Sequence, residues 1–543
     1  MIRLASAALL AGPVLAAAGG AAPLADPPPR LLELSVGNGS TPFRGDGRLL
    51  TTVSPNRDGF RDRAIVRFRL DRAARVLLEA VRTDTIRVGR PAEQRIWSRS
   101  LRLGQGRHSV AWVPARTTPP RTYIVRLTLS DDRGQTRTYG RFRPGPRMRV
   151  DAPIVRVQGI DAGFPLRSYA PGERAELSLA TDARRLTLQV FSYSATARTS
   201  DHQDFRTSGV AMTPPLRVDW RGHRSATGRL RLVRAGDWPS GLYFLRLRAD
   251  DGRVGYAPFI VRPRIFGQRR VAVVLATNTW QAYNFLDRNG DGWGDTWYVS
   301  AGIKSVDLRR PYLDFGVPFR FKDWDLTFIA WLNRTGKSVE FLSDDDLERV
   351  GSGERLARTY DLVVFPGHEE YVTTRAYDLV ERYRDLGGNL IFLSANNFFW
   401  KVQREGERLV RVRRWRDLGR PEARLVGVQY VGSDSGVRQA PYRVTGAETA
   451  PWLFAGTGLA NGSAFGRYGI EIDARTASSP RDLRVVATIP DLMGPGRSAE
   501  MTLYETPAGA RVFAAGALNF AASLDLPEVS RLLENLWSRL SRP

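Results

Sequence analysis

The chain has 543 residues, of which 42% are hydrophobic and 10% aromatic; this composition excludes an intrinsically disordered protein and allows about three domains of ~150 residues. Its formal net charge is +25, yet the arginines are spread through predicted strands without an aromatic–basic stacking motif or a recognition helix. Specific nucleic-acid binding is therefore excluded as a function. The chain has no cysteine, which excludes disulfides, thiolate metal sites and a cysteine nucleophile.

Residues 1–25 are predicted to be a secretory signal peptide. One early arginine precedes an apolar Ala/Leu run that ends in small residues near Ala22 and Ala25, which is the composition of a cleavable export signal. A membrane anchor is the alternative, but the run is short and rich in glycine. No later stretch approaches ~18 uninterrupted apolar residues, so we expect no stable membrane span. The protein is predicted to be secreted or to reside in the cell envelope.

Residues 26–44 are predicted to be a Pro-rich spacer, and residues 45–146 an antiparallel β-sandwich. Segments such as IVRFRL alternate apolar and charged residues, with turn signals about every ten residues. The motif SPNRDGFRD, followed by a strand, resembles the Ig-like module of the flagellar hook-capping protein FlgD. Asn56, Asp58 and Asp62 of this motif could bind a cation, or they could serve a polar turn through their backbone preferences.

Residues 150–262 are predicted to be a second β-sandwich, in which SGLYFLRLRADDG forms a hairpin. From residue 268 the pattern changes. RRVAVVLAT is a short, continuous apolar run, which is typical of a strand buried on both faces. Further strands alternate with helical segments, and this alternation predicts a parallel sheet with helices on both faces. The fold class is therefore multidomain, with two N-terminal antiparallel β-sandwich domains followed by a parallel-sheet α/β domain over residues 268–543.

Three polar clusters follow predicted strands of this sheet. They are TNTWQAY, which ends at Tyr283, GHEEY, which contains His368 and Glu370, and SANNFFW, which contains Asn396. Because ligands bind at the carboxyl ends of parallel strands, we expect these clusters to meet at one edge. His368 and its neighbouring carboxylates could act as a metal ligand or general base, or they could belong to a helix N-terminus capped by Thr373. Asn396 could bind a substrate carbonyl or serve loop geometry.

The motifs TNTWQAYN, RRPY, GHEEY and ANNFFW, taken as a set, resemble the large (beta) subunit of N,N-dimethylformamidase. The resemblance implies a glutamine-amidotransferase-like fold and a mononuclear iron (Fe3+) held by two tyrosines and one glutamate. By motif, Tyr283 and Glu370 match one tyrosine and the glutamate. Tyr312 of RRPY is the assigned second tyrosine, with Tyr298 of DTWY as its competitor.

The same resemblance implies that His368 and Asn396 are catalytic residues beside the metal. Phenolate and carboxylate oxygens are hard donors that suit Fe3+, and such a centre can polarise an amide carbonyl and activate water. His368 would take or relay a proton, and Asn396 would orient the carbonyl. The chain is thus predicted to be an exported amidohydrolase-like enzyme that hydrolyses a C–N amide bond. The family enzyme works with a small partner subunit.

We expect a small amide or a cell-envelope substrate and no nucleic-acid partner. The sequence leaves open whether the chain forms a homo-oligomer. The alternative is a non-catalytic secreted or cell-surface protein that retains the fold and binds a glycan or cell-wall polymer. The two β domains would then be binding platforms, since the sequence shows no catalytic constellation in either.

The stretch NFLDRNGDGWGD, directly after Tyr283, has the D-x-N-x-D-G order of a calcium loop. An EF-hand needs a bidentate carboxylate at position twelve, and that position is Tyr298, so the loop is not an EF-hand. A looser Ca2+ turn is one hypothesis, and a Gly/Asp-rich surface turn is the other. The candidate calcium ligands are Asp287, Asn289, Asp291 and Asp295.

Overall fold

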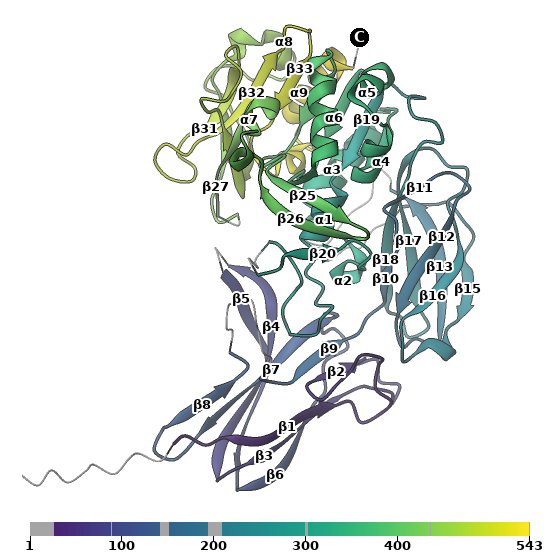
Figure 1. Ribbon diagram of the computed structural model, residues 1–543, viewed down its shortest axis with the longest axis vertical. Helices are drawn as coiled ribbons and strands as arrows, with labels where there is room; N and C mark the ends of the chain where they lie inside the picture. Colours follow the sequence, from purple (N-terminus) through teal and green to yellow (C-terminus); the bar gives the residue numbers. More distant parts are fainter. Residues whose placement is uncertain are drawn as a thin grey trace, which may run out of the picture.

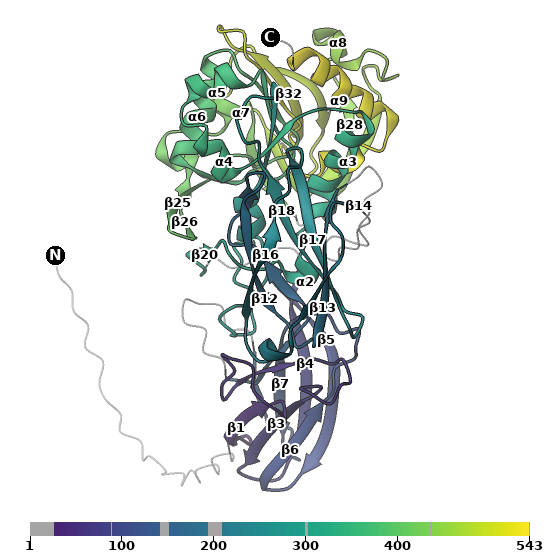
Figure 2. The ribbon, with the colours of Figure 1, turned by 90° about the vertical axis from the view of Figure 1, so that its right-hand side faces the viewer.

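The computed structural model covers most of the chain (Figure 1). The described residues are 27–87, 90–141, 151–193, 209–298, 302–434 and 436–541. The predicted signal peptide, residues 1–25, lies outside them. The described chain is mostly β-sheet, in several sheets, with few helices. Figure 2 shows three units in chain order along the long axis: the first (residues 31–157), the second (161–261) and the third (271–540).

Two sheets of the first unit share one hydrophobic core. One consists of β1 (Leu31–Gly37), β3 (Ala64–Leu70) and β6 (Gly106–Trp112). The other consists of β2 (Leu50–Val53), β9 (Ile154–Val157), β7 (Arg121–Ser130), β4 (Ala74–Arg87) and β5 (Arg90–Leu103), with β8 (Thr136–Tyr139) paired to β7. In β3, Val66 and Phe68 are buried whereas Arg67 and Arg69 are exposed. This is the period-two alternation of a half-buried strand.

The first unit extends beyond the predicted residues 45–146 at both ends. β1 begins inside the predicted spacer and pairs antiparallel with β3, directly after the PPPR run ends at Arg30. β9 lies in the range predicted for the second domain, yet it pairs with β2 and β7 of the first unit. Composition marks the prolines and turns between elements, whereas only strand pairing assigns a strand to a sheet.

The second unit also has two sheets around a core of its own. One sheet consists of β10 (Asp161–Gly163), β12 (Arg174–Ala180) and β16 (Gly228–Arg234). The other consists of β11 (Ser168–Tyr169), β18 (Val254–Val261), β17 (Gly241–Ala249), β13 (Arg185–Ser192), β14 (Val210–Ala211) and β15 (Leu216–Asp219). A short 3-10 turn, η1 (Arg221–His223), precedes β16. The predicted SGLYFLRLRADDG hairpin is formed by β17 and β18, which pair antiparallel.

One half of the large sheet in the third unit is parallel. Its strands in spatial order are β21 (Glu340–Ser343), β19 (Val271–Leu275), β22 (Leu362–Phe365), β24 (Asn389–Phe392) and β33 (Arg511–Ala514). Every residue of the first four strands is buried, as the continuous apolar runs predict. If these strands are numbered 1 to 5 by their order in the chain, their spatial order across the sheet is 2-1-3-4-5, which is a doubly wound order.

The other half of this sheet is antiparallel, so the prediction of a wholly parallel sheet is wrong for the C-terminal part. β33 is followed by β32 (Ala499–Glu505), β31 (Arg484–Ile489), β28 (Gln439–Val444) and β29 (Ala464–Gly469). Residues 490–498 join β31 to β32, and residues 506–510 join β32 to β33. A parallel crossover needs about 10–12 residues or more, so these short connections permit only antiparallel pairing.

Helices cover both faces of the parallel half (Figure 1). Val271 and Val273 of β19 pack in the core that contains α3 and α9, whereas Ala272 and Val274 pack in the core that contains α4, α5 and α6. No helix of the described residues is long and apolar enough to cross a membrane. The helical elements are α1 (Thr277–Ala282), α2 (Leu313–Gly316), η2 (Lys322–Leu326), α3 (Thr327–Arg334), α4 (Asp344–Arg349), α5 (Gly353–Thr359), α6 (Thr374–Asp385), η3 (Trp415–Leu418), α7 (Ala423–Val426), η4 (Ala447–Thr449), α8 (Pro451–Phe454), η5 (Phe520–Ser523) and α9 (Pro527–Leu540).

Two small sheets accompany the large one. The first consists of β20 (Ser305–Asp307), β26 (Arg408–Arg414), β25 (Trp400–Glu405) and β23 (Tyr371–Thr373), and the second of β27 (Gln429–Ser433) and β30 (Glu471–Ala474). β23 follows β22 in the chain and β25 follows β24. The loops that leave these two parallel strands are therefore tied together by the parallel pairing of β23 with β25.

Candidate active site

Three strand ends of the third unit carry the side chains that the motifs single out. β19 leads at once to α1, whose C-cap is Tyr283. β22 leads to His368 and Glu370, and β24 leads to Asn396. The strand after β19 in the chain is added on one side of it, and the later strands are added on the other side, beginning with β22. Open α/β sheets bind ligands at such a switch point, here between β19 and β22. The candidate site therefore lies at the switch point of the parallel half.

Tyr283, His368 and Glu370 form a buried cluster. The Tyr283 hydroxyl donates a hydrogen bond to the Glu370 carboxylate and lies 3.1 Å from Nε2 of His368. The same Nε2 lies 3.4 Å from Oε2 of Glu370. The three residues are only 3%, 1% and 4% exposed, respectively. The structure thus brings together one phenol, one imidazole and one carboxylate away from bulk water.

The His368 ring has a fixed orientation. Its Nδ1 lies 3.1 Å from the carbonyl oxygen of Ala395, and because a carbonyl only accepts, Nδ1 carries a proton. Nε2 then faces the phenol and the carboxylates. Burial alone would lower the pKa of His368, but the charges of Glu471 and Glu370 outweigh it and raise that pKa above its ordinary value. His368 is therefore placed to accept a proton at Nε2.

Asn396 serves loop geometry, and its binding of a substrate carbonyl stays a prediction. Its backbone is left-handed, with φ 54°, and its backbone N–H donates to the Asp473 carboxylate at 2.8 and 2.9 Å. Its side-chain Nδ2 donates to Oε2 of Glu471 at 2.7 Å and to Oε1 of Glu370 at 3.3 Å. Its Oδ1 is buried and has no hydrogen-bond partner among the described residues. Loop geometry thus aims the amide at the carboxylates.

Glu471 and Asp473 belong to the cluster although sequence reasoning missed them. Both lie on β30, and Oε2 of Glu471 is 3.7 Å from Nε2 of His368. Burial raises the pKa of Glu471 to about 7 and that of Asp473 to about 8. The only local signal is GIEIDA, in which acidic and apolar residues alternate, and that pattern alone is typical of a half-exposed strand.

The structure does not bring Tyr312 to this cluster. Tyr312 is the N-cap of α2, where its ring centroid lies 6.4 Å from that of Trp280, and no contact with Tyr283 is found among the described residues. The competitor Tyr298 packs edge-on against Tyr283, with ring centroids 4.8 Å apart. Of the two predicted candidates, only Tyr298 is therefore adjacent to Tyr283.

Tyr371, the last residue of GHEEY, is a phenol that sequence reasoning passed over. Its ring centroid lies 6.0 Å from that of Tyr283. Burial, and after it the charge of Glu370, raises the pKa of Tyr371 well above its ordinary value. The same two causes raise the pKa of Tyr283. In the absence of a cation, both phenols therefore keep their protons.

The alternative interpretation, that the acidic residues of GHEEY belong to a helix N-terminus, explains Thr373 but not Glu369 or Glu370. Thr373 is the N-cap of α6 and accepts a hydrogen bond from the backbone N–H of Ala376. The first turn of α6 contains no acidic residue, so Glu369 and Glu370 lie outside it. The Glu369 carboxyl is buried instead beside the buried carboxyl of Asp344.

The loop after Tyr283 is shaped by Asp287. This carboxylate accepts hydrogen bonds from the backbone N–H groups of Gly290 at 2.7 Å and Gly292 at 2.8 Å. Burial, and then the charge of Asp291, raises the pKa of Asp287 to about 7. The Gly/Asp turn considered from the sequence is thus formed, and it encloses a carboxylate that is only 4% exposed.

The other candidate calcium ligands converge on the same turn. The Asn289 amide donates to Asp291 and Asp295, each at 3.1 Å. Within the described part of the chain, no group of three or more His, Asp or Glu side chains is arranged to hold a metal ion. The calcium turn stays a prediction.

The polar residues of SPNRDGFRD are engaged in a turn and in contacts with the second unit. Asp62 accepts from the backbone N–H groups of Arg57 at 2.7 Å and Gly59 at 2.8 Å. Asp58 pairs with Arg224, and Asn56 donates to Asp251 at 3.1 Å. These contacts are those of the polar-turn interpretation.

Solved structures offer only weak likenesses. A mutant of Salmonella alpha-2-macroglobulin aligns with a TM-score of 0.21 and 13% identity, over 42% of this chain and 16% of that chain. The same protein reacted with methylamine aligns with a TM-score of 0.21 and 14% identity, over the same shares. Scores this low do not define a fold.

Two curated sequence relatives match part of this chain. The N,N-dimethylformamidase beta subunit of Paracoccus aminophilus is 29% identical over 267 residues, covering 42% of this chain and 34% of that protein. The beta subunit from Alcaligenes sp is 29% identical over 202 residues, covering 36% of this chain and 25% of that protein. The chain therefore spans about a third and a quarter, respectively, of the length of these curated relatives.

A family model described as N,N-dimethylformamidase beta subunit-like, C-terminal, matches residues 219–534. This range is more than half of the chain, and it includes the strand ends that carry Tyr283, His368, Glu370 and Asn396. The chain belongs to the N,N-dimethylformamidase beta subunit-like family.

Proposed function

We propose that this chain is an amide hydrolase that cleaves a C–N amide bond at the strand-end site of its third unit. One observation carries the proposal: the side chains of Tyr283, His368, Glu370, Asn396 and Glu471 meet in one buried cluster. The relatives are named N,N-dimethylformamidase beta subunit. Because the chain spans only part of their length, we propose the substrate as a class, a small amide or an amide of the cell envelope.

The donor set fits an iron (Fe3+) centre. Tyr283 and Glu370 would hold the ion together with a second tyrosine, for which Tyr298 and Tyr371 are the adjacent candidates. Burial raises the pKa of Tyr283 and Tyr371, so these phenols need a nearby cation to ionise, and hard oxygen donors suit Fe3+. Once bound, such a Lewis acid would polarise the amide carbonyl and acidify water.

The residues of this chain then handle the proton and the substrate. His368 accepts the proton of the attacking water at Nε2, because Nδ1–H is held by the Ala395 carbonyl. Glu471, 3.7 Å away and with its pKa raised by burial to about 7, can exchange that proton with His368 near neutral pH. The proton returns to the leaving amine when the C–N bond breaks. Asn396 Nδ2 orients the substrate carbonyl by exchanging its longer contact, 3.3 Å to Oε1 of Glu370, for the carbonyl oxygen.

The finer fold assignments belong to the same proposal. We infer that the paired sheets of the first and second units are β-sandwiches, with the first an FlgD-type Ig-like module, because in each unit two sheets share one core. The doubly wound order of the third unit supports a glutamine-amidotransferase-like core. Export to the cell envelope is proposed from residues 1–25 alone. The name beta subunit of the relatives supports an oligomer.

The test is amine release from small amides. The full-length chain, reconstituted with Fe3+, is incubated with dimethylformamide, formamide, acetamide and N-acetylglucosamine. We expect at least one of these amides to release its amine, at a rate that falls by about 100-fold or more in Glu370→Gln. The matched control is Glu354→Gln on the exposed surface of α5, where the same chemical change should leave the rate unchanged.

Two results would contradict the hydrolase proposal. One is that none of the four amides is cleaved by the iron-loaded chain. The other is that Glu370→Gln retains the rate of the unmodified chain. Either result would favour the alternative, a non-catalytic secreted or cell-surface protein that binds a glycan or cell-wall polymer.

A further inference from the structure

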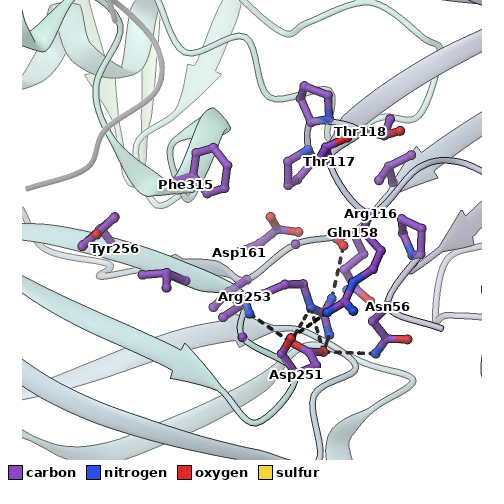
Figure 3. Close-up of a pocket in the computed structure, with 18 residues that line it drawn as sticks. Asn56, Arg116, Thr117, Thr118, Gln158, Asp161, Asp251, Arg253, Tyr256 and Phe315 are labelled. Atoms are coloured by element: carbon purple, nitrogen blue, oxygen red, sulfur yellow. Dashed lines mark hydrogen bonds and ion pairs between the residues drawn. The ribbon is translucent and has the colours of Figure 1, made fainter. Parts of the chain in front are cut away.

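A cavity of about 650 Å³ lies where the three units meet (Figure 3). Its walls come from the loop between β6 and β7, the linker between β9 and β10, the β17–β18 turn, and Phe315 of α2. Small-molecule sites usually measure about 300–1,000 Å³ and prefer domain junctions. Tyr283, His368 and Glu370 do not line this cavity, so it is separate from the strand-end site.

Close packing keeps the walls in place. A Cβ on Gly159 would lie 2.6 Å from Pro120, so only glycine lets the linker approach the β6–β7 loop this closely. A Cβ on Gly316 would lie 1.7 Å from the backbone oxygen of Tyr256, which holds α2 against β18. Phe315 itself has φ 65°, a costly conformation for a bulky residue. The strained backbone is thus held where it presents the Phe315 ring to the cavity.

One buried hydrogen-bond acceptor at the cavity has no donor among the described residues, and a carboxylate lies beside it. Gln158 is 2% exposed, and its Oε1 has no hydrogen-bond partner among the described residues. Asp161 is half-buried and also lines the cavity, and Figure 3 shows it between the Phe315 ring and the Asp251–Arg253 pair. Burying an acceptor without a donor costs free energy. A ligand that donates hydrogen bonds would recover that cost.

The charges that line the cavity balance. Asp161 and Asp251 are its acidic residues, and Arg116 and Arg253 its basic ones. Arg253 is neutralised locally, since it lies 2.5 Å from Asp251 and 2.5 Å from Asp182. Arg116 donates to the backbone oxygen of Asp251 at 2.9 Å. A cavity without net charge favours a neutral ligand over an anion or a cation.

Apolar surfaces complete the lining. Phe315, Tyr256, Pro119 and Pro120 are among the residues that line it. A ligand for this cavity therefore needs hydroxyl groups that donate to Gln158 and Asp161, together with a flat C–H face that packs on rings. Sugars have both features and no charge. We propose that the junction cavity binds a neutral saccharide of one to a few sugar residues.

The experiment titrates the full-length chain with three neutral probes, chitotriose, cellotriose and maltotriose, by calorimetry at millimolar concentrations. At least one trisaccharide should bind. Its affinity should fall by about tenfold or more in Asp161→Ala, which removes an acceptor, and in Phe315→Gly, which removes the ring while suiting the positive φ. Asp237→Ala is the matched control, because the Asp237 side chain is 91% exposed and remote from the lining.

A third variant distinguishes the loss of ligand binding from misfolding of the chain. Thr118→Trp, on the β6–β7 loop, should fill the cavity without removing a buried contact, and it should also weaken binding by about tenfold or more. The proposal is overturned if none of the three trisaccharides binds, or if binding persists in the pocket variants that fold. It is equally overturned if cadaverine or citrate binds at this cavity while the neutral sugars do not.

Discussion

Two groups of buried carboxylates in the third unit differ in what their oxygens contact. In the loop after Tyr283, Asp287 accepts hydrogen bonds from backbone N–H groups. In the strand-end site, Glu370 and Glu471 contact the side chains of Tyr283, His368 and Asn396. Backbone donors fix a turn whether or not an ion binds there. Carboxylates surrounded by titratable side chains can instead exchange protons or take up a cation.

The largest expected effect tests whether only one of the two groups acts in catalysis. His368→Gln should lower kcat/KM for amide hydrolysis by about 10²- to 10⁴-fold, because Nε2 is the proton acceptor of the site. Asp291→Asn in the loop should leave kcat/KM within a factor of about two. Steady-state amine release measures both variants. Equal losses in the two would remove the distinction between them.

The second prediction sharpens the metal donor set. Of Tyr298→Phe and Tyr371→Phe, one should weaken Fe3+ binding by about 10- to 100-fold, because both rings adjoin Tyr283. Tyr312→Phe is the matched control, since Tyr312 packs near Trp280 instead. Competition with a chelator gives the affinities. If Tyr312→Phe shows the largest loss, the observed geometry does not represent the metal-bound site.

The third prediction concerns the support of Asn396. Asp473→Ala removes the acceptor of the Asn396 backbone N–H, and a buried donor left unpaired should cost about 1–3 kcal/mol of unfolding free energy. Asp473→Asn keeps an acceptor oxygen and should cost less. Urea unfolding compares the two variants. A cost for Asp473→Ala no larger than for Asp473→Asn would show that this carboxylate does not hold the loop.

The fourth prediction is a pH dependence in the Asp287 turn, which leaves catalysis untouched. Burial raises the pKa of Asp287 in the folded chain to about 7, so the folded state binds this proton more tightly than the unfolded one. The stability that this bound proton contributes is fully present below about pH 4 and is lost as pH rises through about 7, a loss of about 4 kcal/mol for a shift of about three pKa units. Asp287→Asn should flatten this part of the stability–pH curve.

Calcium provides the companion measurement for that turn. If Asp287, Asn289, Asp291 and Asp295 bind Ca2+, millimolar Ca2+ should raise the midpoint of thermal unfolding at pH 7 and above. The rise should disappear in Asp287→Asn. An unchanged midpoint in the unmodified chain would assign the stretch to a Gly/Asp turn alone.

The strand-end cluster could be predicted from sequence because its signals are local. A continuous apolar run marks a buried strand, and polar residues directly after it must lie at the carboxyl edge of the sheet. Tyr283, His368 and Glu370 all satisfy this rule, and the structure brings them together. The parallel half of the sheet, with helices on both faces, follows from the same alternation.

What sequence reasoning missed depends on non-local pairing. Glu471 reaches His368 because β30 pairs with β27 and bridges to Ala517, and no local periodicity encodes such partners. The RRPY motif predicts Tyr312 as the second tyrosine ligand, but the chain path after the Asp287 loop places Tyr312 near Trp280. Short connections, not composition, made β31, β32 and β33 of the C-terminal half antiparallel.

Iron content and the visible spectrum of the reconstituted chain, measured beside Tyr283→Phe, test the central claim most directly. Two phenols and a carboxylate that hold Fe3+ should give stoichiometric iron and a phenolate absorption band, and Tyr283→Phe should lose that band and most of the metal. A colourless chain that cannot be loaded with iron, or a band unchanged in Tyr283→Phe, would contradict the account.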